Sequence, residues 1–224
     1  MTSPRSRAPA TLCRARFYAI LDSSYVPRAR WRETCAALIE GGAALVQVRA
    51  KRESAPERAA LLDEVLPLFP AAPDSPALIV NDDLDLAARH PGVGLHIGQE
   101  DTPPAEARAR LGPGRLLGLS THSRGQATAA LALPPGTIDY FAVGPVFSTR
   151  TKPDYTPVGL NLVREVAAMR PHLPWFCIGG ITRTNLAHVV EAGAHRVVIV
   201  SDVLCDADPA AAIRTVLGTL PASA

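Results

Sequence analysis

A regular alternation of short apolar runs with longer amphipathic segments is the feature that most constrains how this chain can fold. Each run has four or five residues, a length typical of strands, and a segment with helical spacing follows it. The apolar runs are Phe17–Leu21, Ala44–Val48, Ala77–Val80, Val93–Ile97, Leu116–Leu119, Tyr140–Val143, Trp175–Ile178 and Arg196–Val200. The amphipathic segments are Trp31–Glu40, Glu57–Phe69, Leu84–Arg89, Pro104–Leu111, Arg124–Leu131, Leu160–Arg170, Asn185–Glu191 and Ala207–Leu217. The pattern predicts eight strands, each followed by a helix.

The apolar runs are continuous, which is typical of parallel strands that helices cover on both faces. Eight strand–helix units in 224 residues favour a single α/β domain with the (β/α)8 TIM-barrel fold. An open doubly wound sheet is the alternative, because alternation alone does not show that the sheet closes. No linker divides the chain, so residues 16–220 are expected to form one catalytic domain. Residues 1–15 contain arginines with no apolar stretch between them and are expected to be a disordered leader.

Composition excludes several classes of protein. The net charge of +2 is too small for the basic surface of a general nucleic-acid-binding protein. No apolar stretch reaches the roughly 18–20 residues of a membrane span. The four cysteines are far apart and form no C-x-x-C pair, which favours reduced thiols and a cytoplasmic location. Small molecules are therefore the expected partners, and assembly into a homo-oligomer stays open.

In a TIM barrel the active site lies where the strands end, so the residues after each run carry the functional prediction. Gln47, Arg49 and Lys51 alternate at the end of the second run and are expected to point to one face. A guanidinium beside an ammonium suits a di- or triphosphate, although a solvated loop with ordinary charges is the other interpretation. Lys51 and Lys152 are the only lysines beside 21 arginines, which makes both positions informative.

Acidic residues and glycines follow other runs. Asp82 and Asp101 are candidate Mg²⁺ ligands, because carboxylates that meet at neighbouring strand ends need a cation between them. The alternative for Asp82 is to cap the helix that begins at Leu84. Paired glycines let backbone N–H groups approach a phosphate closely, and a hydroxyl after the last run would add to such a site. A phosphate site is therefore predicted at Gly179, Gly180, Val200 and Ser201.

Two further loops add polar groups to the predicted mouth. After the fifth run, the hydroxyl of Ser120 is a candidate to orient a substrate, whereas His122 is expected to be exposed beside a helix capped by Ser123 or Thr121. The sixth run enters a long loop, and long loops in compact domains commonly bind ligands. Its hydroxyls and cations suit anionic oxygens: Ser148, Thr149, Arg150, Thr151 and Lys152.

Taken together, these motifs resemble the thiamine phosphate synthase family. The resemblance rests on Gln47-Val48-Arg49-Ala50-Lys51, Asn81-Asp82, His96-Ile97-Gly98-Gln99-Glu100-Asp101, Gly118-Leu119-Ser120, Gly144-Pro145-Val146-Phe147, Thr149-Arg150-Thr151-Lys152, Gly179-Gly180-Ile181 and Val200-Ser201. The motifs occur in the family's order from the second run to the eighth, and the resemblance covers roughly Phe17 to Leu217, nearly the whole chain. Each motif alone is weak, but the combination is specific.

The resemblance implies a TIM-barrel transferase of thiamine biosynthesis. It would join hydroxymethylpyrimidine pyrophosphate to hydroxyethylthiazole phosphate, release pyrophosphate and require Mg²⁺. The pyrimidine pyrophosphate would be held by Gln47, Arg49, Lys51, Asn81, Ser120 and Lys152, of which Arg49, Lys51, Ser120 and Lys152 would be catalytic. Asp82 and Asp101 would bind the metal. The thiazole phosphate would be held by Thr149, Thr151, Gly179, Gly180, Val200 and Ser201.

The chain departs from the family at two positions, and two other functions compete. Asp83 adds a carboxylate beside the expected metal site, and the first run ends in Ile20-Leu21-Asp22; neither position is expected to touch the site residues. One competitor is a thiazole tautomerase-like isomerase on the same barrel, which needs no diphosphate–metal site. The other is a non-catalytic paralogue that binds thiamine phosphates. The joint presence of Lys51, Asp82, Asp101 and Lys152 favours the synthase.

Overall fold

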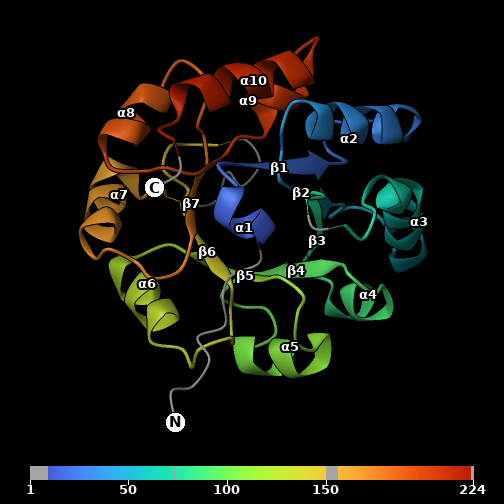
Figure 1. Cartoon of the computed structure of the whole chain (residues 1–224), viewed down its shortest axis with the longest axis horizontal. Coiled ribbons are helices and arrows are strands. Elements are labelled where there is room, and N and C mark those ends of the chain that lie inside the picture. The colour runs from blue at the N-terminus through green and yellow to red at the C-terminus, as the bar shows by residue number, and fades with distance from the viewer. Residues whose placement is uncertain (1–9, 73, 150–155, 223–224) are drawn as a thin grey trace.

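The computed structural model describes residues 10–72, 74–149 and 156–222 of the chain. Within these ranges eight parallel strands pair in chain order, and the first strand also pairs with the eighth. The sheet therefore closes into a barrel, with helices around it (Figure 1). This arrangement confirms the predicted (β/α)8 barrel and excludes the open sheet. No helix in the described part of the chain is both long and apolar enough to cross a membrane.

The elements lie close to the predicted ranges. The strands are β1 (Phe17–Asp22), β2 (Leu45–Arg49), β3 (Ala77–Asn81), β4 (Gly94–Ile97), β5 (Leu117–Thr121), β6 (Tyr140–Val143), β7 (Trp175–Ile178) and β8 (Val197–Val198). The α-helices are α1 (Ala10–Arg14), α2 (Trp31–Glu40), α3 (Ala55–Val65), α4 (Leu84–Arg89), α5 (Pro104–Leu111), α6 (Arg124–Leu131), α7 (Gly159–Ala168), α8 (Leu186–Glu191), α9 (Ser201–Leu204) and α10 (Pro209–Thr219). Short 3₁₀ helices cover Arg28–Arg30 and Leu66–Leu68.

Local chemistry explains where several helices begin and end. The α3 helix starts at a capping box in which Ser54 and Glu57 bind each other's backbone groups. It ends at Val65, earlier than predicted, because Pro67 has no N–H group to donate and its ring would clash with the preceding turn. The Asp208 side chain accepts a hydrogen bond from the Ala211 amide and caps α10.

Each strand is buried on both faces, and the two faces pack against different partners. In β1, Tyr18 and Ile20 belong to a cluster inside the barrel together with Leu45 and Tyr140. The intervening residues, such as Ala19, belong to the layer between the strands and the helices. Because side chains alternate along a strand, every second residue points into the barrel, and this decides which residue of each strand reaches the barrel mouth.

The expectation of a disordered leader is wrong for residues 10–15. These residues form the α1 helix and the turn after it, and both Leu12 and Ala15 are fully buried in the cluster inside the barrel. In Figure 1, α1 lies across the centre of the ring of strands. Leu12 thus shields the interior of the barrel from water at this end. Residues 1–9 lie outside the described residues.

Candidate active site

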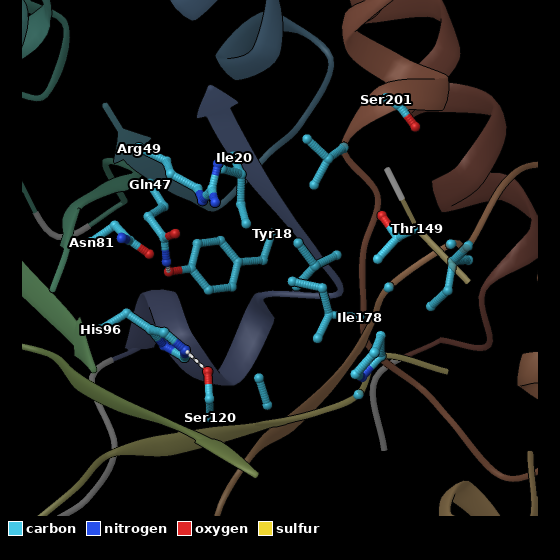
Figure 2. Close-up of a pocket in the computed structure, with 18 of the residues that line it drawn as sticks. Tyr18, Ile20, Gln47, Arg49, Asn81, His96, Ser120, Thr149, Ile178 and Ser201 are labelled. Atoms are coloured by element: carbon cyan, nitrogen blue, oxygen red, sulfur yellow. Dashed lines mark hydrogen bonds between the residues drawn. The ribbon is translucent and has the colours of Figure 1, made fainter. Parts of the chain in front are cut away.

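The inward-facing residues at the carboxyl ends of the strands line one pocket at the barrel mouth (Figure 2). β2 contributes Gln47 and Arg49, β3 contributes Asn81, and β5 contributes Ser120. Gln47 and Arg49 are buried although both are polar, with 2% and 9% of their surface exposed. Barrel closure therefore brings four of the predicted site residues together, and alternation along the second run had placed two of them, Gln47 and Arg49, on one face.

Arg49 forms a buried ion pair that the sequence analysis missed. Its Nη1 donates to Asp22 Oδ2 at 2.6 Å, and the Asp22 side chain is fully buried. Asp22 stands opposite Arg49 in the β1–β2 register, and its other oxygen accepts a hydrogen bond from the Ser24 amide at 2.8 Å. The expectation that Asp22 does not touch the site is thus wrong. This carboxylate holds the guanidinium in place at the mouth.

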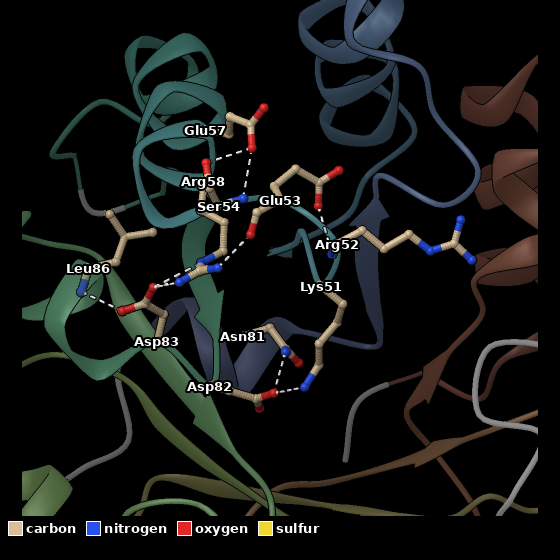
Figure 3. Close-up of polar contacts among 10 residues, drawn as sticks. All are labelled: Lys51, Arg52, Glu53, Ser54, Glu57, Arg58, Asn81, Asp82, Asp83 and Leu86. Atoms are coloured by element: carbon tan, nitrogen blue, oxygen red, sulfur yellow. Dashed lines mark hydrogen bonds and ion pairs between the residues drawn. The ribbon is translucent and has the colours of Figure 1, made fainter.

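Lys51 lies at the rim of the mouth, beside the pocket. Its ammonium bonds the Asp82 carboxylate, which also accepts a hydrogen bond from Asn81 Nδ2 at 2.7 Å (Figure 3). Asp82 has a left-handed backbone with φ of 62°, an uncommon conformation for a residue with a side chain. Its amide donates to the His96 carbonyl at 2.9 Å, which ties this turn to β4. The strained turn directs the carboxylate toward the mouth.

Asp101 approaches Asp82 from the loop after β4. The two carboxylates lie close enough for each to change the pKa of the other, and the Gly98 amide donates to Asp101 Oδ2 at 2.6 Å. Burial and the negative charge of Asp82 raise the pKa of Asp101 above its ordinary value. For Asp82, burial opposes ionisation, but the hydrogen bond and charge of Lys51 outweigh it and lower the pKa. The two predicted metal ligands are therefore neighbours in the structure, and their role as metal ligands stays a prediction.

Asp83 does not join the two carboxylates. It caps α4 by accepting from the Leu86 amide at 2.9 Å, so the capping role considered for Asp82 belongs to its neighbour. The other Asp83 oxygen accepts from Arg58 Nε at 3.0 Å, and Arg58 also donates to the Glu53 carbonyl at 2.7 Å (Figure 3). Asp83 therefore joins the loop after β3 to the loop after β2, the two loops that carry Asp82 and Lys51.

The opposite wall of the same pocket contains the predicted phosphate residues Thr149, Gly179, Gly180, Val200 and Ser201. Both glycines have positive φ, and a Cβ on Gly180 would lie 2.5 Å from the Ser148 carbonyl oxygen. The carbonyls of residues 178 and 179 accept hydrogen bonds from the amides of residues 146 and 147, each at 2.9 Å. In a trans peptide the N–H group points opposite to the carbonyl, so the N–H groups of Gly179 and Gly180 point away from residues 146 and 147. Only glycine fits this close crossing of the two loops.

The loops after β7 and β8, which carry the predicted phosphate residues, are also joined by contacts outside the pocket. Arg183, in the loop after β7, donates to Asp202 in α9 at 2.8 Å and pairs with Asp206 at 2.7 Å. This cluster connects the Gly179-Gly180 turn to the start of α9, where Ser201 stands. The sequence pattern predicted neither α9 nor this connection.

The sequence pattern also did not single out three aromatic residues inside the barrel as site residues. Tyr18 and His96 line the pocket, and Tyr140 lies behind them in the interior. Side-chain alternation could have indicated them, because each lies on the same face of its strand as the other inward-pointing residues. His122 also lines the pocket and its ring bonds the Gly144 carbonyl, so the expectation that it is merely exposed is wrong; Ser123 caps α6, as expected.

Thr151 and Lys152 lie outside the described residues, so their predicted roles stay predictions. No group of three or more His, Cys, Asp or Glu residues suited to a metal ion occurs within residues 10–72, 74–149 and 156–222. The metal ligands predicted from the sequence are a pair of carboxylates, a set that Mg²⁺ can complete with substrate oxygens and water.

Comparisons with known proteins agree with this geometry. Residues 17–203 match the family described as Thiamine monophosphate synthase. Thiamine-phosphate synthase of Arthrobacter sp. (strain FB24) is 40% identical over 96% of this chain and 98% of its own length. The Synechococcus sp. (strain WH7803) protein of the same name is 45% identical over 82% of this chain and 50% of its own length.

A solved structure gives the same result. Thiamine phosphate pyrophosphorylase from Pyrococcus furiosus superposes with a TM-score of 0.74 at 25% identity, covering 93% of this chain and 96% of that one. The fold, the residues at the barrel mouth and the relatives agree with the resemblance noted in the sequence. The chain belongs to the thiamine monophosphate synthase family.

Proposed function

We propose that the pocket joins 4-amino-2-methyl-5-hydroxymethylpyrimidine pyrophosphate to hydroxyethylthiazole phosphate, giving thiamine phosphate and pyrophosphate. Family membership makes the chain a transferase of thiamine biosynthesis. The observation that carries the proposal is that one cavity contains both kinds of anion site. Arg49 and Asn81 lie on one wall, and Gly180 and Ser201 lie on the other.

The two walls suit different phosphate groups. Arg49 and Lys51 supply the positive charge that a pyrophosphate requires, and Lys152 would add to it from the loop after β6. The turn at Gly179-Gly180 and the hydroxyls of Thr149 and Ser201 suit a monophosphate, because N–H and O–H groups bind phosphate oxygens without needing a lysine, and Thr151, outside the described residues, would add a third hydroxyl. Gln47, which lies beside Arg49 in Figure 2, and Ser120 would hold the pyrimidine ring.

Asp82 and Asp101 fit a magnesium ion. Burial and the nearby charge of Asp82 raise the pKa of Asp101, and within the described residues the ammonium of Lys51 is bonded to only one of the two carboxylates. A second cation between the carboxylates would relieve their repulsion, and Mg²⁺ is typically bound by one or two carboxylates together with phosphate oxygens. When bound, the metal would supply positive charge to the departing pyrophosphate.

The residues of the chain have two tasks in the reaction, and the substrate itself supplies a third contribution. Arg49, Lys51 and Lys152 would stabilise the negative charge that develops on pyrophosphate as the bond between carbon and oxygen breaks. The electron-rich aminopyrimidine supports the cation left on its exocyclic carbon. The phosphate wall would hold the thiazole so that its ring nitrogen captures this carbon from a fixed position. No covalent bond to the enzyme forms in this scheme.

The decisive experiment incubates the purified protein with both substrates and Mg²⁺ and measures thiamine phosphate and pyrophosphate. Equal amounts of the two products support the proposal. Absence of both products, with conversion of thiazole phosphate between its tautomers, would assign the pocket to an isomerase instead. Absence of any turnover, with tight binding of thiamine phosphate, would assign it to a binding protein.

Arg49→Ala tests the site in the same assay. A charge-assisted contact is worth about 1.5–3 kcal/mol, so the coupling rate should fall by at least ~10-fold. Arg52→Ala is the matched control, because Arg52 is exposed and its side chain points away from Asp82 in Figure 3. Equal rates in the two variants would remove Arg49 from the site.

We also propose that the protein works in the cytoplasm on small phosphorylated molecules, with neither nucleic acid nor a membrane as partner. All four cysteines are free, and two of them are buried, which suits a reducing compartment. The net charge of +2 supports the absence of nucleic-acid binding.

A further inference from the structure

A continuous line of hydrogen bonds crosses the interior of the barrel beneath the pocket. Gln47 Nε2 donates to the Tyr18 hydroxyl at 2.7 Å, and that hydroxyl is 3.0 Å from the Tyr140 hydroxyl. The Tyr140 hydroxyl is 3.2 Å from His96 Nδ1, and His96 Nε2 is 3.0 Å from Ser120 Oγ. Five strands contribute one residue each, and Figure 2 shows the last of these bonds as a dashed line.

The chemistry of these groups determines which atom donates at each step. The amide nitrogen of Gln47 only donates, so the Tyr18 oxygen accepts from it. Burial raises the pKa of both phenols well above the ordinary value, so each keeps its single hydrogen. The buried Tyr18 hydrogen needs an acceptor and the Tyr140 oxygen is within reach, so we infer that Tyr18 donates to Tyr140 and that Tyr140 in turn donates to His96 Nδ1.

The direction continues to the pocket. A neutral imidazole that accepts at Nδ1 has its hydrogen on Nε2, and this hydrogen is then donated to Ser120 Oγ. Because the Ser120 oxygen already accepts one hydrogen bond, its own hydrogen can turn toward the cavity that Ser120 lines. Gln99 Nε2 holds the Ser120 backbone carbonyl at 2.5 Å and fixes this position further.

We propose that Tyr140 is a positioning residue that holds His96 as the Nε2–H tautomer, so that Ser120 presents a hydrogen-bond donor to the substrate. The ligand atom that faces Ser120 must then be an acceptor, either a ring nitrogen of the pyrimidine or an oxygen of its pyrophosphate. This assignment rests on the proposed function only for the identity of that ligand. Tyr140 itself is fully buried and does not line the pocket, so it acts through His96 and Ser120.

Packing holds the line of residues in one arrangement. The rings of His96 and Tyr140 stack with their centroids 5.6 Å apart, and Tyr18 meets the Tyr140 ring edge-on at 5.8 Å. Gly118 of β5 leaves the space for this stack, because a Cβ there would collide with the Tyr140 ring and lie 2.5 Å from His96 Nδ1. Neither ring can therefore turn to another partner without moving a strand.

The first test is ¹⁵N NMR of the ligand-free wild-type protein, with the His96 signals assigned by their loss in His96→Gln. The hydrogen is expected on Nε2. In Tyr140→Phe the ring stack remains but the donor to Nδ1 is lost, so a mixture of the two tautomers is expected. A His96 hydrogen on Nδ1 in the wild type overturns the inference, and so does an unchanged tautomer in Tyr140→Phe.

The second test is steady-state kinetics. Tyr140→Phe should lower kcat roughly 3- to 10-fold, the range for one misdirected neutral hydrogen bond, and leave KM for the thiazole phosphate unchanged. Thr121→Val is the matched control, because it removes another fully buried hydroxyl, which bonds the Ala142 carbonyl at 2.9 Å outside this line of residues. The control should keep both the wild-type kcat and the His96 tautomer.

The outcomes separate this inference from the proposed function. A wild-type protein that makes no thiamine phosphate refutes the proposed function, whereas the NMR result is independent of turnover. An active enzyme whose Tyr140→Phe variant has the same kcat as Thr121→Val refutes the positioning role alone.

Discussion

Asp22→Asn isolates the buried ion pair at the barrel mouth. The Asp22 side chain is fully buried and that of Arg49 is 11% exposed, so removing the carboxylate charge leaves a guanidinium in a poorly hydrated site. Breaking a buried pair in this way typically costs 3–5 kcal/mol. Because the asparagine oxygen can still accept one hydrogen bond and Arg49 keeps some contact with water, we expect about 3 kcal/mol, the lower end of that range.

The assay is thermal unfolding followed by circular dichroism. In a chain of this size 1 kcal/mol shifts Tm by about 2–4 °C, so Asp22→Asn should lower Tm by about 6–12 °C. Asp85→Asn is the matched control, because it breaks an ion pair with Arg110 on the surface. Exposed ion pairs contribute little to stability, so the control should keep the wild-type Tm.

Pyrophosphate provides the second half of this prediction. Its negative charge should replace that of Asp22 beside Arg49, so added pyrophosphate should raise Tm more in Asp22→Asn than in the wild type. Equal Tm values for Asp22→Asn and Asp85→Asn would refute the reasoning about burial. An equal effect of pyrophosphate on variant and wild type would refute the assignment of Arg49 to the pyrophosphate site.

Four further predictions concern the barrel interior, the thiols and the loop beside the proposed metal site. Gly118→Ala should lower the free energy of unfolding by about 1–3 kcal/mol in urea titrations through overpacking, whereas Gly218→Ala, whose Cβ would meet nothing within 4 Å in α10, should raise it. Thiol labelling of the folded protein at pH 8 should modify Cys13 and Cys205 only. Burial raises the pKa of Cys35 from 9.0 to about 12, so the thiol loses its proton at lower pH in the unfolded state than in the folded state. The free energy of unfolding should therefore fall as pH rises from about 9 toward 12. In Cys35→Ala this fall should be smaller. Asp83→Asn keeps the cap of α4 but breaks the ion pair with Arg58. Half-saturation with Mg²⁺ in the coupling assay should therefore need roughly 2- to 5-fold more metal. An unchanged Mg²⁺ concentration at half-saturation would show that this ion pair does not position Asp82.

Much of the architecture could be read from the sequence because it depends on local pattern. Continuous apolar runs separated by amphipathic segments required parallel strands covered on both faces, and alternation along β2 placed Gln47 and Arg49 on the inner face. The paired glycines after β7 were informative for the same reason, since positive φ is a local property. Helix ends were less predictable, as the early stop of α3 before Pro67 shows.

The contacts that orient the site could not be read from the sequence. Asp22 lies 27 positions from Arg49, and Tyr18 lies 122 positions from Tyr140. Each pair meets only because the strands are in a particular register in a closed barrel, and an isolated strand has no information about the residue opposite it. The sequence by itself determined the eight strand–helix units and the inward face of β2 that carries Gln47 and Arg49, whereas closure of the sheet is a property of the tertiary structure. Only the tertiary structure decided that Asp22 pairs with Arg49 and that Tyr140 contacts His96, because buried polar groups must find partners and closure of the barrel determines which partners are within reach.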